Sequence, residues 1–120
     1  MKTALVVDDS PSIRMLVAHT LAEAGFQVLE GGNGKEGLKQ LDAGAVQIVI
    51  TDLNMPVMDG LEFIREVRKL PRHKFTPILM LTTESGANKK AEGKTAGATG
   101  WLVKPFNPEQ LLQVVGKVLP

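Results

Sequence analysis

Residues 46–60 read VQIVITDLNMPVMDG, and this stretch decides the fold. Its first part, Val46–Ile50, is mostly apolar and β-branched, which is typical of a strand buried on both faces of a parallel sheet. The strand is followed by the polar pair Thr51 and Asp52. A short loop then leads to Asp59, a residue type that often begins a helix as its N-cap. The stretch therefore predicts strand, polar strand end, loop and helix in this order.

The same unit recurs along the chain. The predicted strands are Ala4–Val7, Phe26–Leu29, Val46–Ile50, Ile78–Leu81 and Trp101–Val103. Apolar residues at helical spacing follow each strand, and the pattern is weakest at residues 85–96, where we expect a frayed helix. Strands that alternate with helices predict an α/β fold, a (βα)5 flavodoxin-like, doubly wound parallel sheet with strand order 2-1-3-4-5.

Local signals mark the helix ends. Three predicted N-caps are followed three residues later by Glu or Gln, which predicts capping boxes at Asn33, Asp59 and Asn107. Three glycines that follow an alanine and precede a strand are predicted to end helices: Gly25, Gly44 and Gly97. The basic residues between positions 68 and 74 are expected to lie in a solvated loop.

The composition limits what such a domain can do. At 120 residues, the chain is expected to form one domain over residues 1–120, with no output domain. Lys and Arg number 14 against 13 Asp and Glu, and a net charge of +1 argues against general nucleic-acid binding. The absence of cysteine excludes disulfides, thiolate metal sites and cysteine nucleophiles. The N-terminal apolar run is too short for a signal peptide or membrane span, so we expect a cytoplasmic protein without membrane insertion.

Polar residues follow four of the predicted strands. The segments are Asp8-Asp9-Ser10, Thr51-Asp52-Leu53-Asn54, Thr82-Thr83-Glu84 and Lys104-Pro105-Phe106. Ligands of such sheets bind at the carboxyl ends of the strands, so these carboxylates, hydroxyls and the ammonium are expected to meet at one rim. An ordinary helix-capping turn is the alternative interpretation of Asp8-Asp9 taken alone.

The charges at this rim suggest a chemistry. Three carboxylates at close range repel one another unless a cation or protons neutralise them. Oxygen ligands without His or Cys favour a hard cation, and a site with few protein ligands suits Mg²⁺. A carboxylate can also attack a phosphoryl group to give an aspartyl phosphate. The metal, Lys104 and a threonine hydroxyl would then stabilise charge on the phosphoryl oxygens.

Five separated motifs together resemble the receiver domain of two-component response regulators, over the whole chain. They are Val7-Asp8-Asp9-Ser10, Thr51-Asp52-Leu53-Asn54-Met55-Pro56, Met58-Asp59-Gly60, Leu81-Thr82-Thr83-Glu84 and Lys104-Pro105-Phe106. The resemblance implies a phosphorylation switch rather than an enzyme with a separate substrate. A histidine kinase is the implied phosphodonor, and the face formed by the fourth helix, fifth strand and fifth helix is the implied partner-binding surface.

The resemblance also implies a role for each matching position. Asp52 matches the phosphoacceptor, and Lys104 matches the lysine that pairs with the phosphoryl group. Asp8, Asp9, Asp52 and the backbone carbonyl of Asn54 match the Mg²⁺ ligands. Thr82 and Trp101 match the switch hydroxyl and the switch aromatic. The Lys104–Pro105 bond matches one that is usually cis in this family.

Three positions are expected to tune dephosphorylation. Asn54 and Glu84 are the residue types of single-domain chemotaxis receivers of the CheY type, and they predict fast loss of the phosphoryl group. Thr83 is bulkier than the residue common in the family, which would shield the acyl phosphate and oppose that effect. An indole at Trp101 in place of Tyr or Phe puts the inward swing of the switch aromatic in question. The implied partners are the flagellar motor switch or another protein target, and a phosphatase.

Other functions remain as alternatives. A phosphate sink or phosphorelay intermediate would use the same residues. An aspartate-nucleophile phosphatase needs an acid two residues after the nucleophile, where this chain has Asn54. A flavin or nucleotide module would place a phosphate where Asp8 and Asp9 repel it.

Overall fold

The computed structural model describes residues 2–83 and 87–119. Within them, one parallel sheet has the strand order β2-β1-β3-β4-β5, which confirms the predicted fold class. Its strands are β1 (Thr3–Val7), β2 (Gln27–Gly31), β3 (Ile48–Asp52), β4 (Ile78–Thr82) and β5 (Gly100–Val103). The helices are α1 (Pro11–Glu23), α2 (Gly34–Ala43), α3 (Gly60–Lys69), α4 (Ala87–Ala96) and α5 (Pro108–Val118), with a short 3-10 turn, η1 (Pro71–His73).

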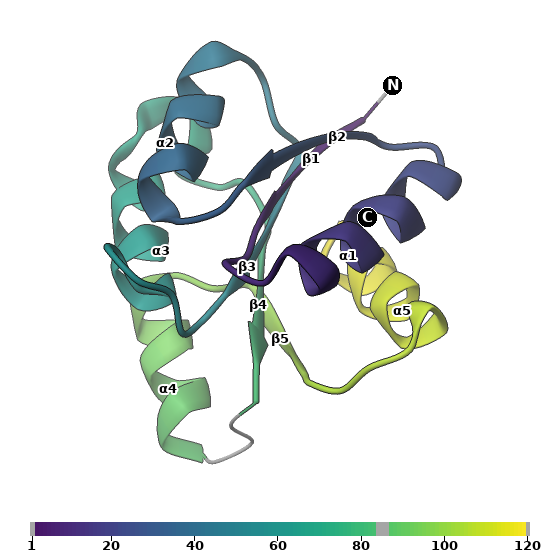
Figure 1. Cartoon of the computed structure of the whole chain (residues 1–120). Helices are drawn as coiled ribbons and strands as arrows, with labels where there is room; N and C mark the ends of the chain where they lie inside the picture. The colour runs from purple at the N-terminus through teal and green to yellow at the C-terminus, as the bar shows by residue number, and fades with distance from the viewer. Residues whose placement is uncertain (1, 84–86, 120) are drawn as a thin grey trace.

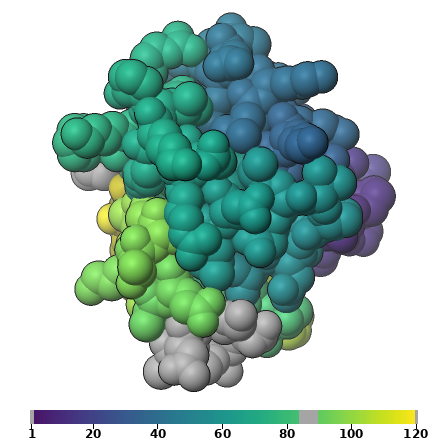
Figure 2. All heavy atoms as spheres, turned by 90° about the vertical axis from the view of Figure 1, so that its left-hand side faces the viewer, coloured from purple at the N-terminus to yellow at the C-terminus, as the bar shows by residue number. Residues whose placement is uncertain are grey.

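Helices cover both faces of the sheet. Helices α1 and α5 lie on one face and α2, α3 and α4 on the other (Figure 1), and Figure 2 shows the second of these faces. Side chains of one strand alternate between the two apolar clusters, so that Val49 packs toward Phe63 while Ile48 and Ile50 pack toward Leu21. Because β1, β3 and β4 have helices on both sides, each contains an uninterrupted run of apolar residues instead of an alternating pattern, and polar residues occur only at the strand ends.

The helix ends agree with the sequence only in part. At α5, the capping box closes, because Asn107 Oδ1 accepts from Gln110 N at 2.8 Å and Gln110 Oε1 accepts from Asn107 N at 3.0 Å. At α2, Asn33 caps the helix, but the Glu36 carboxylate accepts from Gly32 N instead of from the cap residue.

Two of the three glycines predicted to end helices have the left-handed conformation expected at a C′ position. Gly25 and Gly97 have φ of 100° and 118°, which side chains with a Cβ rarely adopt. Gly44 also ends its helix, as the C-cap residue of α2, but the left-handed conformation expected there is wrong, because its φ of −177° is extended backbone that any residue adopts.

Helix α4 forms despite its weak apolar pattern. Gly93 lies so close to β4 that an added Cβ would approach Met80 Cε to 2.7 Å. The helix therefore packs through a small residue and not through a stripe of large apolar side chains. Ser85 and Gly86, at the start of the helix expected from sequence, lie outside the described residues, and the expected fraying stays a prediction.

The prediction of a solvated basic loop at residues 68–74 is wrong for two of its members. Arg68 is partly buried and donates hydrogen bonds to backbone carbonyls, including that of Gly97. His73 is buried, with its Nδ1 atom 3.1 Å from Thr76 Oγ1. The side chains of Arg68 and His73 therefore hold the loop in place instead of extending into solvent.

The loop after β3 contains a strained residue. Val57 has φ of 72°, and Met58 N donates to Pro56 O at 2.8 Å, which closes a three-residue turn around Val57. A β-branched residue in this conformation is an outlier, and the cost of such strain is about 1–3 kcal/mol.

We expect Val57→Gly to stabilise the protein by about 1 kcal/mol, because glycine, which has no Cβ, adopts positive φ without the strain that valine suffers. The side chain of Val57 is 68% exposed, so little packing is lost. Urea unfolding measures the change, and Val57→Ala, which keeps a Cβ at the same φ, is the matched control. Equal stability of the Gly and Ala variants would show that the turn is not the source of strain.

Across residues 2–83 and 87–119, no helix is both long enough and apolar enough to cross a membrane.

Candidate functional site

The register of the sheet brings the predicted site residues to one edge. Val7 is opposite Thr51, and Asp52 is opposite Leu81, so the ends of β1, β3 and β4 are level. Hydrogen bonds continue past the strands: Asp8 N donates to Gly31 O at 3.1 Å, and Lys104 N donates to Thr82 O at 2.8 Å. The segments that follow the strands are therefore held side by side.

The three acids meet as predicted. One carboxylate oxygen from each of Asp8, Asp9 and Asp52 lies within 4.8 Å of the others. Asp8 and Asp52 are buried, whereas Asp9 is exposed. The site is thus open to solvent on the side of Asp9 and closed by the sheet on the side of Asp8.

Lys104 joins this cluster from the segment after β5. Its Nζ atom is 3.0 Å from Asp52 Oδ1 and 3.2 Å from Asp8 Oδ2. The peptide bond between Lys104 and Pro105 is cis, as the resemblance implies. The lysine therefore bridges two carboxylates that would otherwise repel each other.

Asp52 is held through one of its two oxygens. Oδ1 accepts from Leu53 N at 2.9 Å and from Lys104 Nζ. Among the described residues, no hydrogen bond ends on Oδ2, which leaves this oxygen available for a new bond. Burial, and then the charge of Asp8, raise the pKa of Asp52 above its usual range, although the hydrogen bond from Lys104 opposes this.

The site carries an excess of negative charge when its acids are ionised. Burial alone would lower the pKa of Lys104, but the hydrogen bond and charge of Asp52, with the charge of Asp8, raise it overall. One ammonium then faces three carboxylates. Oxygen-only donors with uncompensated negative charge fit a hard divalent cation such as Mg²⁺.

Arg14 is a residue of the site that the sequence reasoning missed. Its Nη1 atom donates to Asp8 O at 2.7 Å, and its Nε atom donates to Glu30 Oε1 at 3.2 Å. Arg14 thus fixes the backbone of Asp8 from α1 and ties it to the end of β2. The polar Glu30 at that strand end was visible in the sequence, but nothing in the spacing pairs it with Arg14.

Three of the remaining predicted residues that the structure describes lie at the end of β4 or in the segments that follow β3 and β4. Thr82 is buried at the end of β4, beside the backbone of Lys104. Asn54 and Thr83 are exposed in the segments that follow β3 and β4. Glu84 lies outside the described residues. The roles expected of these residues in metal binding, switching and dephosphorylation stay predictions.

Trp101 lies at the surface of the edge strand β5. Its side chain is 38% exposed, and the Nζ atom of Lys90, from α4, is 5.2 Å from the centre of its ring. An ammonium at this distance over an indole face is attracted to it. The contact connects α4 to β5 and favours the outward position of Trp101.

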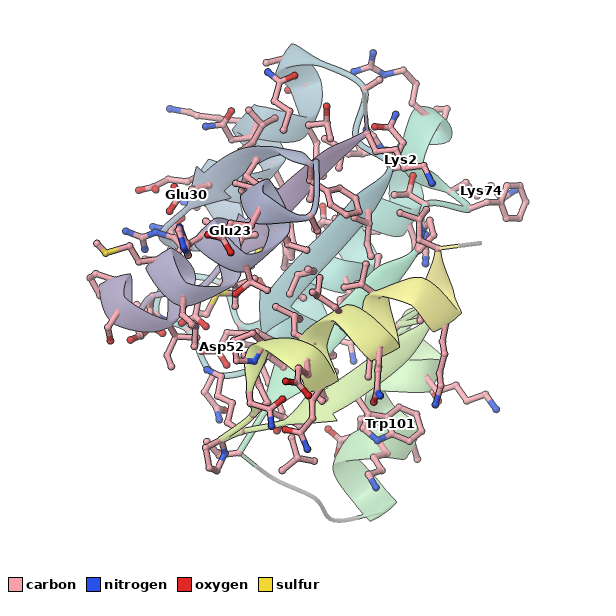
Figure 3. The ribbon with its side chains drawn as sticks, turned by 90° about the vertical axis from the view of Figure 1, so that its right-hand side faces the viewer. Lys2, Glu23, Glu30, Asp52, Lys74 and Trp101 are labelled. Atoms are coloured by element: carbon pink, nitrogen blue, oxygen red, sulfur yellow. The ribbon has the colours of Figure 1, made fainter. Side chains whose placement is uncertain are left out.

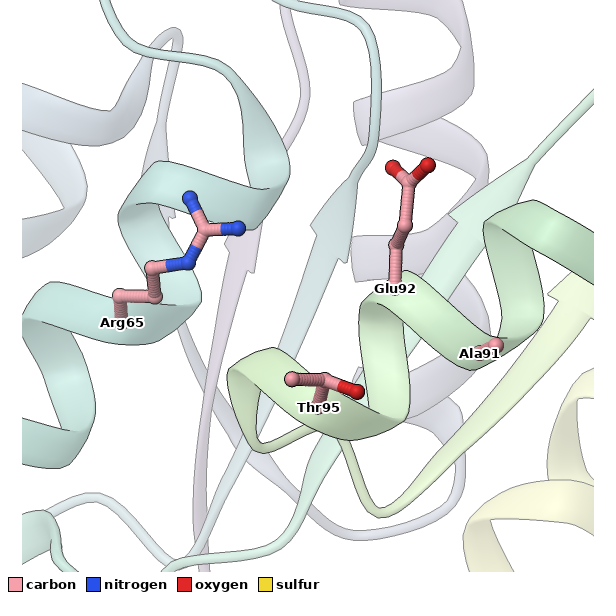
Figure 4. Close-up of a pocket in the computed structure, with 4 residues that line it drawn as sticks. All are labelled: Arg65, Ala91, Glu92 and Thr95. Carbon is pink, nitrogen blue, oxygen red and sulfur yellow. The ribbon is translucent and has the colours of Figure 1, made fainter.

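A separate hollow between α3 and α4 does not rival the acidic cluster. It is lined by Arg65, Ala91, Glu92 and Thr95, with the arginine on one wall and the carboxylate on the other (Figure 4). One carboxylate opposite one guanidinium does not supply the ligands that a divalent cation requires.

The fold and the acidic site together define a class of protein. Residues 4–116 match the model of the response regulator receiver domain, and the chain belongs to this family. It is a phosphoacceptor switch domain with an acidic Asp8, Asp9 and Asp52 site, not an enzyme that turns over a separate substrate.

Individual relatives are similar over nearly the whole chain. Chemotaxis protein CheY1 of Helicobacter pylori is 42% identical over 117 residues, which are 96% of this chain and 94% of that protein. The crystal structure of chemotaxis response regulator CheY4 of Vibrio cholerae is 54% identical, covers 99% of both chains and has a TM-score of 0.96. The response regulator TrrA of Thermotoga maritima, solved in complex with Mg²⁺-BeF, is 39% identical, covers 99% of this chain and all of that chain, and has a TM-score of 0.86.

Proposed function

We propose that Asp52 accepts a phosphoryl group from the phosphohistidine of a histidine kinase and that Mg²⁺ assists this transfer. The observation that carries the proposal is the meeting of three carboxylates within 4.8 Å with Lys104 at 3.0 Å from Asp52. We assign Asp8, Asp9, Asp52 and the backbone carbonyl of Asn54 as the metal ligands. When bound, Mg²⁺ supplies positive charge that offsets the carboxylates and the phosphoryl oxygens.

Every bond that this phosphoryl transfer forms or breaks involves Asp52 or the phosphohistidine. A carboxylate oxygen of Asp52 forms a bond to phosphorus, the bond from phosphorus to the histidine nitrogen breaks, and the imidazole leaves with the electron pair and takes up a proton. The oxygen of Asp52 that carries no hydrogen bond among the described residues is the suitable nucleophile. Lys104 can then move its hydrogen bonds from the carboxylates to a phosphoryl oxygen.

The consequence of phosphorylation is proposed to be a change in the α4–β5–α5 face. Thr82 lies beside Lys104 through the bond from Lys104 N to Thr82 O, and Trp101 lies on β5 in contact with α4. A movement of Thr82 toward the phosphoryl group would shift the equilibrium of Trp101 and α4 between conformations that already exist before phosphorylation. The chemotaxis proteins among the relatives support a chemotaxis role, with the flagellar motor switch as the downstream target.

Several finer points belong to the same proposal. A phosphate sink or phosphorelay intermediate would use the same site and differ only in the partner. The phosphatase expected to end the signal, the fast dephosphorylation through Asn54 and Glu84, and the cytoplasmic location stay predictions. No feature of the site favours the aspartate-nucleophile phosphatase or the flavin module.

Phosphorylation by acetyl phosphate, followed by intact-mass spectrometry, tests the proposal without knowledge of the kinase. We expect the mass of one phosphoryl group to appear in the presence of Mg²⁺ and to stay absent after chelation with EDTA. Uptake that is independent of Mg²⁺, or no uptake under either condition, would contradict it.

Trp101 provides a second prediction, because it is the one tryptophan of the chain and its emission reports on a single position. We expect beryllofluoride with Mg²⁺ to change the emission. Lys90→Met should lower the beryllofluoride concentration required by about 2- to 5-fold, because a surface cation–π contact of about 0.5–1 kcal/mol no longer holds the indole outward.

Lys94→Met, which removes a charge from the same helix, is the matched control and should titrate like the wild type. A flat emission signal in the wild type would show that Trp101 does not move. Equal titrations of the Lys90 variant and the wild type would show that Lys90 does not bias it.

A further inference from the structure

The loop between η1 and β4 presents an aromatic side chain to solvent. Phe75 is 87% exposed, the most exposed of the large apolar side chains that the structure describes. It follows Lys74, whose Nζ atom is 5.8 Å from the centre of the phenyl ring. Isolated apolar side chains on a surface are common, so the exposure alone indicates nothing.

The backbone on both sides of Phe75 is held by one guanidinium. Arg68 Nη1 lies 3.0 Å from His73 O, 3.2 Å from Lys74 O and 2.6 Å from Thr76 O. These carbonyls come from the two residues before Phe75 and the one after it. A loop that must only connect α3 to β4 does not need three carbonyls gathered on one partly buried side chain.

Two further contacts fix the base of the same loop. The buried His73 lies with Nδ1 3.1 Å from Thr76 Oγ1, so the residues that flank the exposed pair are joined below it. Arg72 Nη2 donates to Leu41 O at 3.0 Å and so attaches the loop to the end of α2. The loop is thus ordered before any partner arrives, and Phe75 is presented at its tip.

Ordering a loop and its side chains is a large part of the cost of forming an interface, and a fixed loop avoids most of it. Aromatic anchors that enter a pocket of the partner contribute most to such interfaces. We infer that Phe75 and Lys74 form a protruding docking site for a partner protein. The surface of that partner has an apolar pocket with acidic residues at its edge. This inference does not rest on the phosphoryl-transfer proposal.

Charge determines the kind of partner. Lys74 lies at the loop tip and Lys2 lies at the same end of the molecule, opposite the end that carries Asp52 (Figure 3). An acidic protein surface complements this end. A membrane is disfavoured, because polybasic membrane segments use clusters of about 4–8 Lys and Arg, and Arg72 here is engaged with a backbone carbonyl.

The docking site formed by Phe75 and Lys74 lies away from the proposed phosphorylation site. Phe75 precedes β4, at the amino end of the strands, whereas Asp52 ends β3 and Asp8 and Asp9 directly follow β1 at the carboxyl end. A partner on Phe75 would therefore leave the acidic cluster accessible to a phosphodonor. A variant of Phe75 should accordingly accept a phosphoryl group from acetyl phosphate at the wild-type rate.

Site-specific photocrosslinking identifies the partner. Benzoylphenylalanine is placed at position 75 of the full chain in the cells that express it naturally, and at position 15 in a control, because Met15 is 66% exposed on α1. We expect irradiation to join position 75, but not position 15, to a protein that mass spectrometry identifies. Absence of a crosslink specific to position 75 would overturn the inference.

Binding of that purified partner then tests the contact itself. Phe75→Ser should weaken binding by about 10- to 100-fold, as loss of an aromatic anchor does, while Phe75→Leu should retain most of it. Lys74→Glu should weaken binding more at low salt than at high salt. Equal affinity of the serine variant and the wild type would contradict the inference.

Vesicles of phosphatidylglycerol and phosphatidylcholine in equal parts test the membrane alternative. We expect the wild type and Phe75→Ser to sediment with them equally weakly. Binding to these vesicles that depends on Phe75 would replace the protein partner with a lipid surface and overturn the inference. Unchanged thermal unfolding of Phe75→Ser and unchanged labelling by acetyl phosphate serve as the controls for folding and for the separate site.

Discussion

Asp52→Asn should abolish the acyl phosphate and, at the same time, stabilise the metal-free protein. An amide oxygen is a poor nucleophile, so no acyl phosphate forms at this position. Asp52 is buried beside Asp8, and Lys104 keeps its second partner, Asp8, when Asp52 is replaced. Loss of activity together with a gain in stability cannot come from unfolding.

The pH dependence follows from the direction of the pKa shift. Burial, and then the charge of Asp8, raise the pKa of Asp52 above its ordinary value of 3.8, so the folded state binds this proton more tightly than the unfolded state. The contribution of Asp52 to the free energy of unfolding therefore falls as pH rises from about 3.8 through the pKa of the folded state. At neutral pH, ionised Asp52 still lowers the free energy of unfolding by this amount. The stability gain of Asp52→Asn should be small in acid and full at neutral pH.

Urea unfolding across this pH range, with mass spectrometry after acetyl phosphate treatment, measures both effects. Asp42→Asn, a change of an exposed acid near the opposite end of the sheet, should alter neither the labelling by acetyl phosphate nor the stability. A phosphoryl group on the Asp52→Asn protein would show that another residue is the acceptor. A loss of stability at neutral pH would show that the pair with Lys104 outweighs the cost of burial.

Lys104→Met should separate metal binding from phosphoryl transfer. Removal of the ammonium should tighten Mg²⁺ binding, because the lysine at 3.0 and 3.2 Å no longer competes for the Asp52 and Asp8 carboxylates. The rate of phosphorylation by acetyl phosphate should fall by about 10²- to 10³-fold, the usual cost of losing a donor to developing charge. Opposite changes in these two quantities are not expected from a general distortion of the site.

Without metal, the Lys104→Met protein should also be less stable, by about 3 kcal/mol, because two buried carboxylates lose their shared partner. The assays are therefore run in saturating Mg²⁺, with folding checked by circular dichroism. Lys104→Arg retains the charge and should recover part of the rate. Parallel loss of metal affinity and rate in Lys104→Met would contradict the role assigned to this lysine.

Much of the site could be predicted because parallel strands end at the same edge of a sheet. Once residues 46–60 are recognised as strand, loop and helix, the acids after β1, the acid at the end of β3 and the lysine after β5 have to come together. The distances among Asp8, Asp52 and Lys104 confirm that meeting. Their chemical roles remain proposals, since proximity alone does not identify the nucleophile.

The two arginines that organise the loops could not be predicted. Arg14 reaches the carbonyl of Asp8 and the carboxylate of Glu30, and Arg68 reaches Gly97 from 29 residues earlier in the chain. A basic residue on a helix has the same sequence pattern whether it is solvated or bound to carbonyls. The choice depends on which carbonyls the folded backbone leaves within reach.

The sequence by itself determined the order of strands and helices and the residues at the strand ends, because both depend on local apolar pattern and chain direction. Only the tertiary structure decided that Asp8 is buried while its neighbour Asp9 is exposed, and that Trp101 lies at the surface beneath Lys90. Only it showed that the loop carrying Phe75 is fixed by Arg68. These features depend on long side chains and on backbone groups from distant segments, and such groups become neighbours only after the sheet and its helices have packed.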